Sequence, residues 1–130
     1  MATREFLTVD VMSAASGYLL STEGIGVVYN VLGFATGESI FTHQLPRVGR
    51  EFREALLAER PELAETFDYI KANCTKETVG EVAAEIERRL GMSMTVRTMN
   101  ADQHERIDPV SELAEKVSPD RIIIVPVGSK

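Results

Sequence analysis

Apolar side chains recur at the three- and four-residue spacing of a helix in several stretches of the chain. The stretch 27–35 predicts a buried helix that ends at Gly37, although its β-branched residues leave a strand open. Pro46 and Pro61 each predict the start of a further helix, since proline suits the first helical position. The chain up to about residue 70 is therefore predicted to be mostly helical.

The opening stretch is less regular, because the apolar residues over 6–12 fit no single period. We expect a short helix that is capped by Thr8 or Asp10 and ended by Gly17. A brief extended piece over 18–20 is expected to follow it.

The last fifty or so residues alternate between helix and strand patterns. Thr78 and Glu81 have the spacing of a capping box at the start of a helix that ends at Gly91. The alternation over 92–97 predicts a strand with one buried face, and the apolar run over 121–127 predicts a core strand. The connection between these strands is long enough for a parallel pair.

A further helix is predicted between the two strands. Asp108 supplies a carboxylate cap, and the proline after it suits the first helical position. The helix has an apolar stripe that we expect to be buried, consisting of Val110, Leu113, Ala114 and Val117.

These elements predict an α+β or small α/β fold. Its N-terminal half is mostly helical, and its C-terminal helix–strand–helix–strand unit forms a small sheet packed by helices. We expect one domain over 1–127 and a flexible tail over 128–130.

Composition narrows the function classes without selecting one. The net charge of −6 argues against a nucleic-acid partner, since such binders usually have the opposite balance. Cys74 is the only cysteine, so no intrachain disulfide can form, and a reducing cytoplasm is expected. The longest apolar runs are too short to span a bilayer, and no membrane partner is expected.

No strong catalytic or cofactor motif is present, so we expect no cofactor and favour a non-enzymatic protein. Gly24 and Gly26 lack the third glycine of a dinucleotide-binding fingerprint. Asp102, His104 and Asp108 match no specific metal-site spacing, and no metal is expected.

Thr42, His43 and Gln44 form a candidate binding loop before a helix N-terminus. His43 has two interpretations. It is either a general base or contact residue, or a structural histidine that bonds to loop carbonyls.

The helix that follows has three arginines on one stripe, Arg47, Arg50 and Arg53. They are candidates to receive phosphate or carboxylate groups. The ordinary alternative is a solvated face whose arginines pair with Glu51 and Glu54.

Two blocks carry a resemblance to a known family: Ser13–Leu20, and Phe41–Arg47 with the sequence FTHQLPR. Together with Leu32–Gly37 they resemble a small uncharacterised domain of tailed bacteriophages and prophages. The resemblance covers about residues 8–61, and a weaker echo lies over 104–125. Ala15 and Ser16 stand where that pattern has threonines. The resemblance implies a phage origin and a location in the host cytoplasm, but no reaction.

Three hypotheses follow. The first is a phage accessory protein that binds a host or phage protein, for example to inhibit a bacterial defence or regulatory protein. The second is a small enzyme or ligand-binding domain centred on His43 and the nearby arginines. The third is a structural homo-oligomer whose apolar run over 122–127 pairs across an interface.

Overall fold

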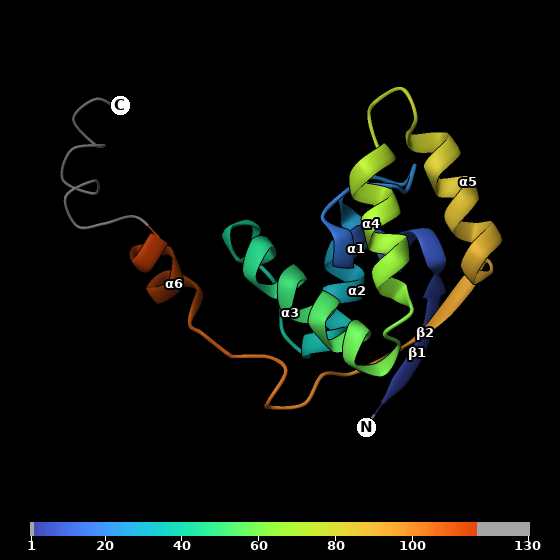
Figure 1. Cartoon of the computed structure of the whole chain (residues 1–130). Helices are drawn as coiled ribbons and strands as arrows, with labels where there is room; N and C mark the ends of the chain where they lie inside the picture. Colours follow the sequence, from blue (N-terminus) through green and yellow to red (C-terminus); the bar gives the residue numbers. More distant parts are fainter. Residues whose placement is uncertain (1, 117–130) are drawn as a thin grey trace, which may run out of the picture.

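The computed structural model describes residues 2–116, which form six helices, one short 3₁₀ turn and two strands (Figure 1). In chain order they are β1 (Thr3–Leu7), α1 (Thr8–Ser16), α2 (Gly26–Thr36), η1 (Thr42–Gln44), α3 (Leu45–Glu59), α4 (Leu63–Asn73), α5 (Val79–Leu90), β2 (Ser93–Arg97) and α6 (Pro109–Lys116). The predicted strand over 121–127 and the tail over 128–130 lie outside the described residues, so the homo-oligomer hypothesis stays a prediction.

The predicted α+β class is confirmed, but the described sheet has a different partner strand. β1 and β2 pair antiparallel, in a register that runs from Thr3 opposite Arg97 to Leu7 opposite Ser93. The predicted strand over 92–97 is confirmed, and Met94 and Val96 form its buried face. The sequence analysis missed β1 because this short strand is mostly exposed and shows no alternation of apolar and polar positions.

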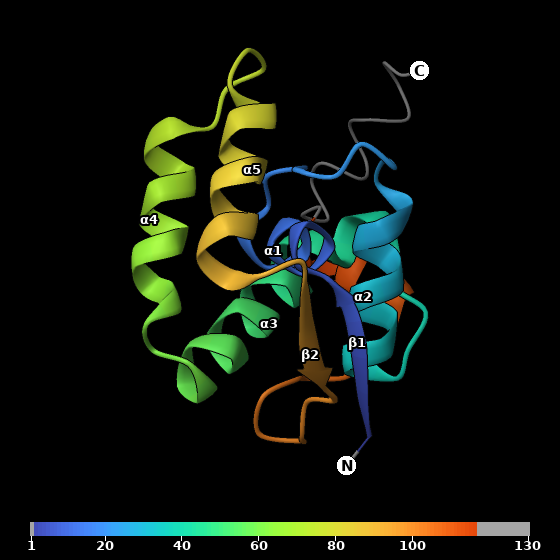
Figure 2. The ribbon, with the colours of Figure 1, turned by 90° about the vertical axis from the view of Figure 1, so that its right-hand side faces the viewer.

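Helix α1 lies at the centre of the molecule. It packs against both strands and against α2, α3, α4 and α5. In Figure 2 the strands lie in front of it, with α4 and α5 on one side and α2 on the other. Its buried residues include Val11, Met12, Ala14 and Ala15. The sequence over 6–12 fits no single period because it crosses from β1 into α1, and because α1 is buried on most of its surface.

Glycine ends the first two helices, as the sequence predicts. Gly17 and Gly37 both adopt the left-handed conformation, with φ of 82° and 75°, and each donates its N–H back to the preceding helix. This conformation carries little penalty without a Cβ, so these two glycines set where α1 and α2 stop. Residues 18–20 after α1 belong to neither a helix nor a strand.

The predicted N-terminal caps of α1 and α5 are wrong. Neither Thr8 nor Asp10 makes a capping bond in α1, and the Thr8 hydroxyl instead donates to the carbonyl of Gly91 at 2.6 Å. The Thr78 hydroxyl donates to the carbonyl of Asn73 at 2.6 Å, and it forms no capping box with Glu81. Both threonines fix connections between elements that are distant along the chain or separated by a turn.

Helix α6 starts as predicted but buries the opposite face. Asp108 caps it by accepting the N–H of Ser111 at 3.1 Å. Two residues of the predicted stripe face outward, with Val110 75% and Leu113 46% exposed, whereas Glu112 is only 3% exposed. Val117 lies outside the described residues. Charged contacts on the Glu112 side hold α6 in place, so the apolar pattern predicted the wrong face.

The buried apolar residues of the described chain form one core that α1, α2, α3, α4, α5 and β2 share. The chain then leaves β2 as an extended stretch and runs to α6, which lies to one side of the other helices (Figure 1). None of the described helices combines the length and the apolar character that a membrane crossing requires.

Candidate functional site

The candidate loop Thr42–Gln44 holds the C-terminal part of the described chain in place. Nε2 of His43 lies 2.7 Å from the carbonyl oxygen of Pro109, at the start of α6. The Thr42 hydroxyl lies 2.8 Å from the hydroxyl of Tyr29 on α2. His43 therefore has the contact that the structural interpretation predicts.

Gln44 is buried and bridges the same two parts of the chain. Its side-chain amide nitrogen donates to Oε1 of Glu112 at 3.0 Å and to the carbonyl of Ile107 at 3.3 Å. The side-chain carbonyl oxygen of Gln44 accepts a hydrogen bond from the N–H of Phe41 at 3.0 Å. Both ends of the side chain are thus used within the protein.

Arg47 makes a two-pronged contact with Glu112. Its guanidinium donates to both carboxylate oxygens of Glu112, at 2.7 and 2.9 Å. It also donates to Glu51 at 2.9 Å and to the carbonyl of Glu105 at 2.8 Å. The hydrogen bonds that Arg47 donates to Glu112 are the main cause that raises the pKa of Arg47 above its ordinary value. Burial opposes this rise, and the charge of Glu51 adds to it. Arg47 therefore anchors α6.

His104 lies next to this pair, in the polar stretch between β2 and α6. It is only 8% exposed, and its two ring nitrogens lie 2.6 Å from Glu51 and 2.5 Å from Glu38. No local signal predicts this burial, since Glu51 and Glu38 are 53 and 66 residues away in the sequence.

These side chains form one cluster, which we call the ionic latch: Glu38, Gln44, Arg47, Glu51, His104 and Glu112. It joins α3 to the stretch after β2, so the FTHQLPR block contacts the residues of the weaker C-terminal echo. Within the described residues, no group of His, Cys, Asp or Glu is arranged to hold a metal ion. The geometry of the latch is that of a structural anchor.

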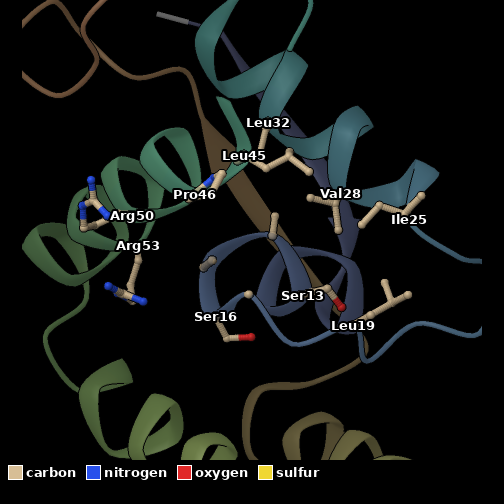
Figure 3. A pocket seen from close by; sticks show the side chains of 14 residues that line it. Ser13, Ser16, Leu19, Ile25, Val28, Leu32, Leu45, Pro46, Arg50 and Arg53 are labelled. Atoms are coloured by element: carbon tan, nitrogen blue, oxygen red, sulfur yellow. The ribbon is translucent and has the colours of Figure 1, made fainter. Parts of the chain in front are cut away.

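The remaining two candidate arginines lie elsewhere, at a pocket between α1, α2 and α3 of about 390 Å³. We call it the arginine-rimmed pocket. Figure 3 shows Arg50 and Arg53 on α3 at one side, with Leu19 and Ile25 at the opposite side. The sequence analysis did not predict this pocket, because its walls come from three separate helices.

Small residues create the space. The last turns of α1 contribute Ala14, Ala15 and Gly17 to the wall, and α3 contributes Gly49. A Cβ on Gly49 would come within 3.2 Å of the carbonyl oxygen of Ala14, so glycine lets the two helices approach closely. The pocket therefore lies at a tight helix crossing.

Apolar side chains form most of the remaining wall, notably Val28, Leu32 and Leu45. Two serine hydroxyls also line the pocket, but each already bonds to the backbone. Ser13 donates to the carbonyl of Val9 and accepts the N–H of Leu20, and Ser16 accepts the N–H of Tyr18. Among the described residues that line the pocket there is no histidine, cysteine or carboxylate. This wall suits binding better than acid–base catalysis.

Arg50 and Arg53 make no ion pair within the described part of the chain, and neither pairs with Glu51 or Glu54. Arg50 is exposed and Arg53 is half-buried. Of the three arginines on the stripe, Arg47 thus forms its contacts within the ionic latch, while Arg50 and Arg53 line an apolar pocket. His43 does not line the arginine-rimmed pocket.

Comparison with known proteins places part of the chain in context. Residues 6–66 match a family described as a domain of unknown function (DUF7736). The matched stretch runs from β1 into α4 and includes the residues of the arginine-rimmed pocket. No curated protein and no solved structure matches the chain.

Proposed function

We propose that this protein is non-enzymatic and acts by binding another protein through the arginine-rimmed pocket. The observation that carries the proposal is the pairing of an apolar hollow with two arginines that have no ion pair in the described chain. Protein interfaces favour such a combination of apolar contact area and arginine.

The opposite side of the pocket adds exposed apolar surface. Leu19 is 44% and Ile25 is 51% exposed, and both line the pocket. A partner that covers them would remove apolar surface from water at the place where it meets the arginines. The lining also offers no acid or base for catalysis, which favours binding over a reaction at this site.

The resemblance to phage domains supplies the proposed setting. We place the protein in the cytoplasm of a bacterial host as a phage accessory protein, with a host or phage protein as its partner. Inhibition of a bacterial defence or regulatory protein fits this setting. The net charge of −6 disfavours a nucleic-acid partner.

The test removes the exposed apolar side of the pocket. We expect Leu19→Ser/Ile25→Ser to abolish capture of a partner from bacterial host lysate, because the double change removes two apolar contacts without emptying the core. Quantitative mass spectrometry of tagged wild-type and variant proteins measures the loss.

A matched control removes two exposed apolar side chains on another part of the molecule, Leu7→Ser/Met92→Ser. This variant is expected to capture the same partner as the wild type. If no captured protein distinguishes the two variants, the pocket is not the binding site and the proposal fails.

A small-molecule site in the same pocket is the second candidate, favoured by its volume. Ligand pockets commonly measure roughly 300–1,000 Å³ and have apolar walls with few polar groups. A medium-chain carboxylate that raises the melting temperature of the wild type, but not of Arg50→Gln/Arg53→Gln, would favour this candidate.

A further inference from the structure

The arginine-rimmed pocket has a neighbour. A second hollow of about 290 Å³ lies between α3 and α4, and Ser16 and Arg53 line both. The two hollows therefore adjoin, with Arg53 at their junction. We call the pair the double groove.

Both hollows have apolar walls. In the second hollow these walls are Leu57, Ala64 and Phe67, and Tyr18 lies beside them. An occupant that used the whole groove would thus place one apolar side chain in each hollow. It would also pass over Arg53 between them.

The charges around the double groove are mainly positive, in a chain whose net charge is −6. Arg50, Arg53 and Lys71 line it, and none of them makes an ion pair within the described residues. Asp68 is the one acidic residue in the described lining. A local excess of cations on an acidic protein selects a partner of opposite charge and orients it.

We propose that the double groove binds an acidic amphipathic segment of the partner protein. Two apolar side chains of the segment fill the hollows, and a carboxylate between them meets Arg53 and Arg50. An amphipathic helix that lays its apolar face into a groove presents anchors at this kind of spacing. The inference rests on the proposed function and names the chemistry of its partner.

Charge also favours an acidic segment over the chain's own residues 121–127 as the occupant of the groove. That run is apolar, but its only charged residue is Arg121. It would bring a further cation to a groove that already holds three. An acidic segment fits the groove better than this one.

Three synthetic peptides test the proposal. The first is a short amphipathic helix with leucines on one face and glutamates beside them. The second has lysine in place of every glutamate, and the third keeps the glutamates but has serine in place of every leucine. Fluorescence anisotropy measures the binding of each labelled peptide to the full chain.

We expect the acidic leucine peptide to bind at least about tenfold more tightly than the other two, because only it has both features that the groove requires. Arg50→Glu/Arg53→Glu should weaken its binding by at least about tenfold. A control on another face, Lys76→Glu/Arg88→Glu, makes the same change in net charge and should alter binding by less than about twofold.

Equal binding of the acidic and basic peptides, equal binding of the serine peptide, or no effect of Arg50→Glu/Arg53→Glu would each overturn the inference. These outcomes are separate from failure of the proposed function. If the peptides fail but Leu19→Ser/Ile25→Ser still loses a captured protein, the pocket binds a partner of other chemistry. If the peptides bind but no captured protein depends on the pocket, the proposed function falls instead.

Discussion

Arg47, Arg50 and Arg53 are chemically identical residues on one stripe of α3, yet they have different roles. Arg47 lies against Glu112 and Glu51, and its raised pKa means that this contact favours the charged guanidinium. When folding raises the pKa of a group, the group stabilises the fold at every pH below its pKa in the unfolded chain. This stabilisation is lost only as the pH rises through the still higher pKa in the folded protein. The Arg47 contact therefore adds no pH dependence near neutrality. Arg50 and Arg53 make no ion pair within the described residues, and binding of a partner there is our proposal.

The ionic latch gives the residue-scale prediction. Arg47→Met should lower the free energy of unfolding by about 3 kcal/mol, because it removes the guanidinium that donates to both oxygens of the buried Glu112 carboxylate. Urea denaturation measures the change. Arg60→Met is the control, since it breaks an exposed pair with Glu62 and should cost less than about 1 kcal/mol. Equal costs for the two variants would mean that the latch does not hold α6.

At the scale of elements, the crossing of α1 and α3 shapes the pocket. α1 is short and buried, and α3 passes close to it where Gly49 faces the carbonyl of Ala14. Helix propensity alone favours alanine over glycine inside a helix. Glycine at this position therefore reflects the close contact between the helices rather than the needs of α3 itself.

Gly49→Ala is expected to destabilise the protein by about 1 kcal/mol, because the new methyl group meets a backbone oxygen that cannot easily move. Gly80→Ala is its control in α5, where a Cβ meets nothing within 4 Å, and it should stabilise by up to about 1 kcal/mol. The urea concentration at the midpoint of unfolding measures the stability of each variant, provided that the m-value is unchanged. If Gly49→Ala stabilises as much as Gly80→Ala, the crossing is looser than the structure indicates.

At the scale of the whole molecule, distant parts of the chain complete each other. β1 pairs with β2, and α1 packs against α5. The N–H of Met99 donates to the carbonyl of Ala35 at 2.8 Å, which ties the stretch after β2 to α2. The matched stretch 6–66 thus ends before several of the elements that cover its core.

A fragment of residues 1–66 is therefore expected not to fold on its own, since it lacks β2, α5 and most of α4, which cover α1. Circular dichroism should find a weak helical signal without a cooperative thermal transition, whereas residues 1–116 should unfold cooperatively. A cooperative transition in the short fragment would instead identify the matched stretch as an independent folding unit.

Local sequence patterns determined where most elements of this protein lie. Gly17, Gly37 and Gly91 predicted three helix ends, and the alternation over 92–97 predicted β2. These predictions succeed because backbone geometry and the burial of one face act between residues that are close in the sequence. The FTHQLPR block contributes Gln44 and Arg47 to the ionic latch, a role that no pattern along the chain predicted.

Only the tertiary structure decided which groups meet. It paired β2 with β1, buried His104 and Glu112, and turned Val110 and Leu113 of α6 outward. It also placed Arg47 against Glu112 in the ionic latch, and Arg50 and Arg53 at the pocket. The physical reason is that ion pairs and pocket walls join residues from separate elements, and spacing along one helix carries no information about the partner across the contact.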